Sequence, residues 1–236
     1  GFREPSNNYS VTIGDSCEAH LARLDGKEVQ HGPDMTILSF YVAHIAVAGE
    51  GGVVLTDSDK LAHSCRSVRV PGRKGGAEFF DFERIGWNSK MNDLCAAVGI
   101  EGLQNMRANF EKRRKVRTWM IEALSKYEDD LILYRDGPGE IISPHAFPVV
   151  LRDPKRNVKP FMEHLAANGV EVKTLFGSLP TQHKAFAWMG HKLGEFPVAE
   201  RIGRTGCHWG CNENIDEGDV EYLASVVEAY FAKEAA

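Results

Sequence analysis

The stretch TILSFYVAHIAVAGEGGVVLTDS (residues 36–58) indicates what kind of fold this chain adopts. Residues 36–43 and 51–58 are rich in β-branched and apolar side chains, which predicts two strands, and the glycines between them predict a turn. His44 lies between the first predicted strand and the Gly-Glu-Gly-Gly turn at residues 49–52. An imidazole takes up and returns protons near neutral pH, so His44 is a candidate for chemistry. A packed or surface histidine is the commoner alternative.

Strands and helices alternate on both sides of this stretch. Residues 9–19 predict a short buried strand that runs into an acidic turn, and residues 58–70 predict a helix that begins at a serine cap. A long helix begins at Asn92 and continues to about residue 124, with Asn92 or Asp93 as its cap. Gly99 and Gly102 are costly inside a helix, so they predict close packing against a neighbour.

The second half of the chain has the pattern of a smaller α+β unit. Residues 130–136 and 143–151 predict strands, and Pro144 and Pro148 place the second of these at an edge or at its start. Residues 158–172 predict a helix that stops at Gly169 and is followed by a strand. Residues 216–235 predict an amphipathic closing helix. The apolar face of this last helix contains Val220, Leu223, Val226, Val227 and Tyr230.

Composition excludes several classes of protein. The chain has 236 residues, a formal net charge of -5 and a pI near 6.0, which does not suggest a general nucleic-acid binder. The basic run at residues 111–117 is more typical of a solvated helix face. No apolar run approaches the ~20 residues that a membrane span needs, and the opening residues do not resemble a signal peptide. Five cysteines, an odd number, favour a reducing compartment, so we expect a cytoplasmic protein.

Cys207 and Cys211 flank His208 in the segment GCHWGC. A zinc site would need further ligands at matching spacing, and none stands nearby in the sequence. Buried thiols at the end of a strand are the favoured interpretation, so we expect no metal site.

Four polar residues could contact a ligand. Asp15 directly follows a predicted buried strand, which is where α/β folds place ligand-binding groups, although it could simply cap a helix. Glu18 follows three residues later. Ser39 brings a hydroxyl group to the end of the next predicted strand. Asn88, shortly before the long helix, could donate to a phosphate or cap a turn.

The order and spacing of these residues resemble one family. The series D-x-x-E-A (15–19), S-F-x-x-x-H (39–44), G-E-G-G (49–52) and G-x-N-x-K-M-x-D-x-x-A-A-x-G (86–99) resembles the DegT/DnrJ/EryC1/StrS sugar aminotransferases. The resemblance continues to the end of the chain. It implies a fold-type I pyridoxal-phosphate (PLP) enzyme of the α/β class. Residues 1–126 would be the remaining part of the PLP-binding large domain with its linking helix, and residues 127–236 a small α+β domain. The N-terminal portion of the family has no counterpart.

The resemblance also implies roles for the site residues. Asp15 matches the carboxylate that holds the pyridinium nitrogen of the cofactor, and Ser39 matches a ligand of its phosphate. Glu18 stands where most members have glutamine and is counted with the cofactor-binding residues. Asn88 matches a residue that reaches the cofactor phosphate of the neighbouring subunit, which implies a homodimer with shared sites.

His44 stands where most members have the lysine that binds PLP covalently. This exchange marks the 3-dehydratase branch, and the chain resembles the GDP-4-keto-6-deoxymannose 3-dehydratases in particular. The resemblance implies that pyridoxamine phosphate (PMP) condenses with a nucleotide-linked 4-keto-6-deoxyhexose and that His44 removes a proton from the C4′ carbon of the cofactor. The C3 hydroxyl group is then expelled, and glutamate regenerates the amine.

Some members of this branch carry an iron–sulfur cluster on closely spaced cysteines. Because no cysteine lies between Cys65 and Cys95, we expect no such cluster. Two alternatives stay open beside the dehydratase. One is a sugar-nucleotide aminotransferase that uses another lysine. The other is a truncated, non-catalytic member that acts as a binding or assembly module.

Overall fold

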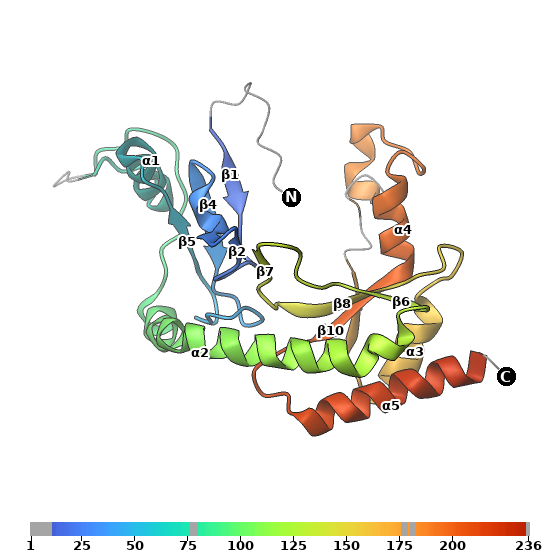
Figure 1. The fold of residues 1–236 in the computed structure, drawn as a ribbon. Coiled ribbons are helices and arrows are strands. Elements are labelled where there is room, and N and C mark those ends of the chain that lie inside the picture. Colours follow the sequence, from blue (N-terminus) through green and yellow to red (C-terminus); the bar gives the residue numbers. More distant parts are fainter. Residues whose placement is uncertain (1–10, 76–79, 176–178, 180–182, 235–236) are drawn as a thin grey trace. The chain divides into compact units, whose positions relative to one another are not determined.

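The computed structural model describes residues 11–75, 80–175, 179 and 183–234 (Figure 1). The chain forms two compact units, and the long helix α2 (Asp93–Leu124) contains the boundary between them. The first unit consists of Gly1–Phe110 and Gly137–Ser143, and the second of Glu111–Asp136 and Pro144–Ala236. The mixture of helices and sheets confirms the α/β class predicted from the sequence.

A three-stranded sheet forms the centre of the first unit. Its strands are β1 (Ile13–Asp15), β4 (Met35–Ser39) and β5 (Gly52–Leu55), with β4 in the middle. β1 runs parallel to β4, and β5 runs antiparallel to it. These strands confirm the three predicted within residues 9–58, but they are shorter than predicted, and residues 9 and 10 lie outside the described residues. The prediction that the first strand is buried is wrong, because Ile13 and Asp15 of β1 are exposed.

The strand predicted over residues 36–43 ends at Ser39, so its last four residues were assigned wrongly. The backbone N–H of Phe40 still reaches Gly51 O at 2.9 Å, but the chain then turns, and the N–H of His44 bonds Tyr41 O at 3.0 Å. The aromatic side chains of this segment favour a strand locally, and the turn that the tertiary structure imposes overrides that preference.

A second small sheet in the first unit was not predicted. It pairs β2 (Arg23–Leu24) with β3 (Lys27–Glu28) and with β7 (Glu140–Ile141), both antiparallel. The turn between β2 and β3 is Asp25-Gly26, whose φ angles are 51° and 78°. Asp-Gly is a preferred pair for such turns because both central residues need positive φ. A single-turn helix, η1 (Val29–His31), follows β3.

Both predicted helix starts in the first unit are confirmed. Ser58 Oγ accepts from the N–H of Leu61 at 3.3 Å at the start of α1 (Asp59–Arg69). Asn92 Oδ1 accepts from the N–H of Cys95 at 2.9 Å at the start of α2. A side-chain oxygen at this position satisfies a backbone donor that has no partner inside the helix.

The second unit is built on a four-stranded antiparallel sheet. Its order is β6 (Leu131–Leu133), β8 (Ala146–Leu151), β10 (Gly206–Gly210) and β9 (Val172–Thr174). The sequence prediction that Pro148 puts its strand at an edge or at its start is wrong, because β8 pairs with β10 on one side and with β6 on the other. β6 ends opposite Val149, so one side of β8 has no paired strand at Pro148 and the missing N–H is tolerated.

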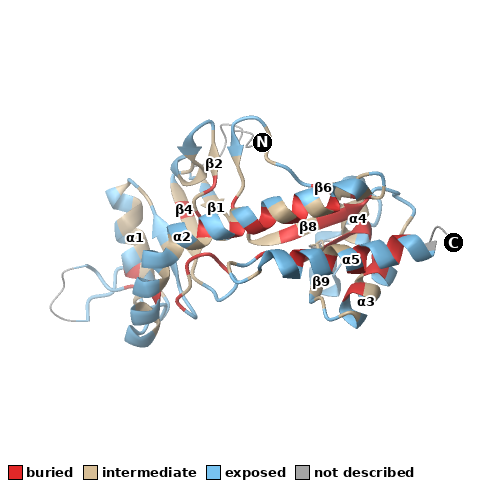
Figure 2. Ribbon diagram, turned by 60° about the horizontal axis from the view of Figure 1, so that its bottom comes forward, coloured by how far each residue is buried: buried red, intermediate tan, exposed pale blue. Residues whose placement is uncertain are grey.

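Among the residues that the structure describes, the second unit also contains three further helices and two short 3-10 helices. They are η2 (Ser125–Tyr127), α3 (Lys159–Ala167), η4 (Lys184–Met189), α4 (Pro197–Thr205) and α5 (Glu217–Glu234). The predicted stop after α3 is confirmed by Gly169, whose φ is +77°. The predicted apolar face of α5 is buried, and Figure 2 shows buried residues along β8, α3 and α5.

The two units differ in how much apolar core they contain. One large cluster of buried side chains, which includes Phe147, Phe161 and Trp209, fills the second unit. In the first unit, the buried hydrophobic residues among those that the structure describes are Ala22, Ile45, Ala46, Ala48 and Phe110. No helix in the described part of the chain is both long and apolar enough to span a membrane.

Candidate functional site

Asp15 ends β1, at the same end of the parallel pair as Ser39 of β4. Its Oδ1 accepts from the backbone N–H of Cys17 at 3.1 Å. The thiol and the N–H of Cys17 hold the pKa of Asp15 below its usual value, and the nearby imidazole of His44 lowers it further. Asp15 therefore stays a charged, exposed acceptor at neutral pH.

Cys17 shows the reverse effect. Burial, together with the neighbouring Asp15 carboxylate, raises the pKa of this thiol to about 11. The thiol thus remains protonated and serves as a donor to Asp15, so it is not a candidate nucleophile.

Ser39 lies at the last position of β4, and its side chain is half-buried. Its Oγ accepts from the backbone N–H of Tyr41 at 3.2 Å. This contact fixes the side chain and uses one lone pair of the oxygen. The hydroxyl proton can therefore still be donated to an anionic oxygen.

His44 lies in the turn that follows β4, with only 8% of its surface exposed. The centre of its ring is 6.2 Å from the ring of Tyr41 and 5.9 Å from that of His20. The charge of His44 contributes, after the hydrogen bonds from Cys17, to the lowered pKa of Asp15. The sequence-predicted residues Asp15, Ser39 and His44 thus all lie at the ends of two neighbouring strands.

The two other predicted residues lie on separate segments of the first unit. Glu18 is exposed in the turn after β1, where the N–H of Ala19 bonds Ser16 O at 3.0 Å. Asn88 is exposed in the segment before α2. Its neighbours are fixed there, because the N–H of Trp87 bonds Val68 O at 2.8 Å and that of Ser89 bonds Arg69 O at 2.9 Å.

Sequence reasoning missed His20. It is 3% exposed, and its ring meets the ring of Phe40 edge-on at 6.2 Å as well as lying near His44. Its place five residues after Asp15, in the same GDSCEAH segment, was the available signal. The signal was weak because the sequence alone does not show in which direction the turn orients the side chain of His20.

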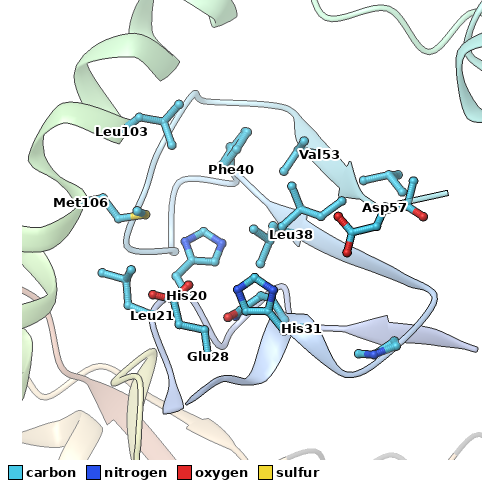
Figure 3. A pocket seen from close by; sticks show the side chains of 15 residues that line it. His20, Leu21, Glu28, His31, Leu38, Phe40, Val53, Asp57, Leu103 and Met106 are labelled. Atoms are coloured by element: carbon cyan, nitrogen blue, oxygen red, sulfur yellow. The ribbon is translucent and has the colours of Figure 1, made fainter. Parts of the chain in front are cut away.

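A cavity of about 710 Å³ lies against the sheet of the first unit. Figure 3 shows that His20 and His31 both contribute to its wall, as do Leu103 and Met106 from α2. The wall also contains Glu28 and apolar side chains of β4 and β5. His31, for which the sequence offered no interpretation, is thus an exposed residue of this cavity wall.

The chemistry of Asp15 and Ser39 can be compared with that of PLP or PMP, the cofactor implied by the sequence resemblance. A carboxylate whose pKa is held low suits the cationic ring N–H of such a cofactor, and an oriented hydroxyl group suits its phosphate. His44 lies close enough to influence Asp15 electrostatically. The residues present therefore fit this group.

Cys207 and Cys211 are buried at β10 and just after it, as predicted for structural thiols. Burial raises the pKa of each to about 12. Across the residues that the structure places, no group of three or more His, Cys, Asp or Glu side chains could hold a metal ion.

The chain is similar in sequence to one family of known proteins. Residues 6–228 match the profile of the DegT/DnrJ/EryC1/StrS aminotransferase family. The chain is 28% identical over 224 residues to a GDP-4-keto-6-deoxy-D-mannose 3-dehydratase from Yersinia pseudotuberculosis, covering 86% of this chain and 56% of the relative. It is 27% identical over 210 residues to a dTDP-3-amino-3,4,6-trideoxy-alpha-D-glucose transaminase from Micromonospora megalomicea, covering 85% and 54%.

Solved structures confirm the fold. The aminotransferase TlmJ from Streptoalloteichus hindustanus superposes with a TM-score of 0.84 at 24% sequence identity, covering 95% of this chain and 59% of that one. The chain therefore has the fold of fold-type I PLP-dependent aminotransferases. It spans only a little over half the length of the curated relatives that it matches.

Proposed function

Since the chain belongs to the DegT/DnrJ/EryC1/StrS aminotransferase family, we propose that it takes part in deoxysugar biosynthesis as a PLP/PMP-dependent 3-dehydratase. The proposed substrate is a nucleotide-linked 4-keto-6-deoxyhexose. The observation that carries this proposal is the buried imidazole of His44 in the turn after β4, at the same end of the parallel pair of strands as Asp15. The resemblance to a named 3-dehydratase from Yersinia pseudotuberculosis supports it.

Each of the predicted site residues would have a separate role in binding the cofactor. Asp15, ionised at neutral pH, would pair with the protonated ring nitrogen of the cofactor. Ser39 would donate its hydroxyl proton to the phosphate, and Glu18 would complete the cofactor-binding set. Asn88 would serve the phosphate of a neighbouring subunit in a homodimer. The bound cofactor supplies an electron sink that makes the loss of a hydroxyl group possible.

His44 would transfer the proton. An imidazole nitrogen takes up the proton that dehydration releases and can return it, because its pKa range lies near neutral pH. An imidazole cannot form the stable covalent link that a lysine amine forms with PLP. A buried histidine at this position therefore favours proton transfer on a non-covalently held PMP over lysine-based transamination.

Two alternatives remain candidates. Relatives named as transaminases favour an ordinary sugar-nucleotide aminotransferase, which would need another lysine. A non-catalytic binding or assembly module is the second alternative. With the dehydratase we also propose glutamate as amino donor, a cytoplasmic location, no iron–sulfur cluster, and no nucleic-acid or membrane partner.

Product mass is the deciding measurement. The protein is incubated with PMP, glutamate and a panel of 4-keto-6-deoxy sugar nucleotides, and the products are analysed by mass spectrometry. We expect a 3-deoxy product that is lighter than its substrate by one oxygen atom. An amino sugar would instead establish transamination. Covalent trapping of PLP on a lysine by borohydride would independently support that alternative.

The non-catalytic alternative has a different signature. It predicts a stably folded protein that gives neither product and does not bind the cofactor, as followed by the absorbance of PMP or PLP during equilibrium dialysis. Cofactor binding together with a 3-deoxy product would exclude this alternative.

A further inference from the structure

Two buried imidazoles face each other at the candidate site. His20 is 3% exposed and His44 is 8% exposed. Their ring centres are 5.9 Å apart, with an angle of 46° between the ring planes. The proposed function uses only His44, so the second buried imidazole beside it needs a separate explanation.

The backbone around His20 is fixed from several sides. The N–H of Ala19 bonds Ser16 O at 3.0 Å, and the N–H of Ala22 bonds Ala19 O at 3.1 Å. The side-chain amide of Gln30 donates to Ala19 O at 2.7 Å. The ring of Phe40 stands edge-on to the His20 ring. These contacts therefore fix the position of His20 next to the ring of His44.

Electrostatic repulsion limits the number of protons that these two imidazoles can bind. Two imidazolium groups at this separation and this degree of burial repel each other, so the first proton on the pair makes the second harder to add. The Asp15 carboxylate beside His44 favours the first proton. The cavity wall that contains His20 also contains the titratable residues Glu28, His31 and Asp57, and the ring of Tyr41 meets that of His44 edge-on. Glu18 is exposed two residues before His20 in the sequence.

His20 also lies in the wall of the cavity against β4 and β5 (Figure 3). Water that enters this cavity can therefore reach the His20 side of the pair. Because His20 contacts the cavity, the pair can exchange a proton with solvent through His20 while His44 itself stays buried.

We propose that His20 is a positioning residue for His44 and that the two imidazoles bind one proton as a coupled pair. The significance of the pair for dehydration rests on the proposed function, but the pairing itself does not. His44 accepts a proton readily only while the pair holds none, because a proton already on His20 repels a second one on His44. His20 would thereby control when His44 can act as a base.

The test is a titration of the cofactor-free protein, with histidine ring carbons followed by NMR. In the wild-type protein we expect the signals of His20 and His44 to titrate in two steps that both rings report. In His20→Gln, His44 is expected to titrate in a single step, with a midpoint about one pKa unit above the second step of the wild-type pair. The reciprocal His44→Gln variant should convert His20 to a single step.

His31→Gln is the matched control, because His31 lines the same cavity but is exposed. It should leave both titration curves unchanged. Superimposable His44 curves in wild-type protein and folded His20→Gln would overturn the proposal, as would single-step, independent curves for both rings in the wild-type protein. The wild-type curves decide the question even where His20→Gln fails to fold.

The titration needs neither cofactor nor substrate, so its result is independent of the product analysis. A coupled pair in a protein that makes an amino sugar would contradict the dehydratase and leave the pair established. Where dehydration is measured, His20→Gln should displace the pH profile of kcat with little change in KM. A change in KM alone would contradict a positioning role.

Discussion

At the scale of single residues, His44 is the position on which the proposed chemistry depends. It is buried, it lies beside an ionised carboxylate, and it follows Ser39 by five positions in a segment that turns instead of continuing as a strand. A lysine here would favour covalent attachment of PLP, whereas an imidazole is restricted to moving protons.

His44→Asn is expected to lower the rate of dehydration by about 10² to 10⁴-fold, because the amide retains polarity but cannot take up a proton near neutral pH. Affinity for PMP should stay similar, since Asp15 and Ser39 are unchanged. The rate is measured by product mass spectrometry and the affinity by equilibrium dialysis. His191→Gln, an exposed histidine in the second unit whose Nδ1 lies 2.7 Å from Glu195, serves as control. Unchanged turnover in His44→Asn would contradict the assignment.

His145 is a second residue with a testable protonation property. Burial lowers its pKa below the usual value of 6.5, and the charges of Arg113 and His208 lower it further. The unfolded chain therefore binds a proton at this position at a higher pH than the folded chain does. The free energy of unfolding therefore has its full value when the pH is above the pKa of His145 in the unfolded chain. It decreases as the pH falls from that value toward the lower pKa that His145 has in the folded chain.

We therefore expect the second unit to lose stability as the pH falls below about 6.5. His145→Gln should reduce the slope of this loss, whatever its effect on absolute stability, because glutamine does not titrate. Urea unfolding followed by tryptophan fluorescence at a series of pH values measures the slope. Equal slopes in the two proteins would show that His145 is not the group responsible.

At the scale of elements, α2 contacts the segment after β4 through two glycines. A Cβ atom on Gly99 would stand 3.1 Å from the Cβ of Ala48, and a Cβ on Gly102 would meet the backbone of Val47, at 2.8 Å from its nitrogen. The prediction of close packing from these glycines is thus confirmed. The close approach also holds in place the segment that carries His44.

Gly102→Ala is expected to destabilise the first unit by about 1–3 kcal/mol, because backbone atoms of Val47 cannot move aside easily. This cost should exceed the gain of about 1 kcal/mol that alanine brings to a helix. Gly99→Ala is the comparison variant. It should destabilise the first unit less, because its new methyl group meets a side chain instead of backbone atoms. Thermal unfolding measures both. A Gly102→Ala protein as stable as the wild type would contradict this packing.

At the scale of the whole molecule, the two units differ in the apolar surface that they bury internally. The second unit encloses a continuous cluster that includes Leu124, Phe161 and Val227, each without exposed surface. The first unit leaves large apolar side chains such as Ile85 and Leu94 exposed, at 90% and 82%. Because buried apolar area is the main source of stability, the second unit is expected to be the more stable of the two.

Native-state hydrogen exchange tests this difference. Backbone amides of β8 and β10 should be protected at least about ten-fold more strongly than those of β4 and β5, which corresponds to about 1.4 kcal/mol in local opening free energy. Equal protection in the two sheets would show that the first unit gains stability from something other than its internal core.

Much of the fold could be predicted because local signals and tertiary structure agree. Ser58, Asn92 and Gly169 mark helix ends through backbone bonding that depends on a few neighbouring residues. The apolar face of α5 follows from periodicity alone. The errors fall where distant residues decide. Pro148 is tolerated in a central strand only because β6 is short, and residues 40–43 turn although their side chains favour a strand.

The sequence by itself determined the family, the order of most elements, and the candidate residues Asp15, Ser39 and His44, because these depend on residue type and spacing along the chain. Only the tertiary structure decided that the strands carrying Asp15 and Ser39 end at the same side of the sheet and that His20 packs beside His44. Such neighbours are set by how β1 and β4 pair and by how the following turns fold back. Turn geometry of that kind follows from long-range packing, which no short stretch of sequence encodes.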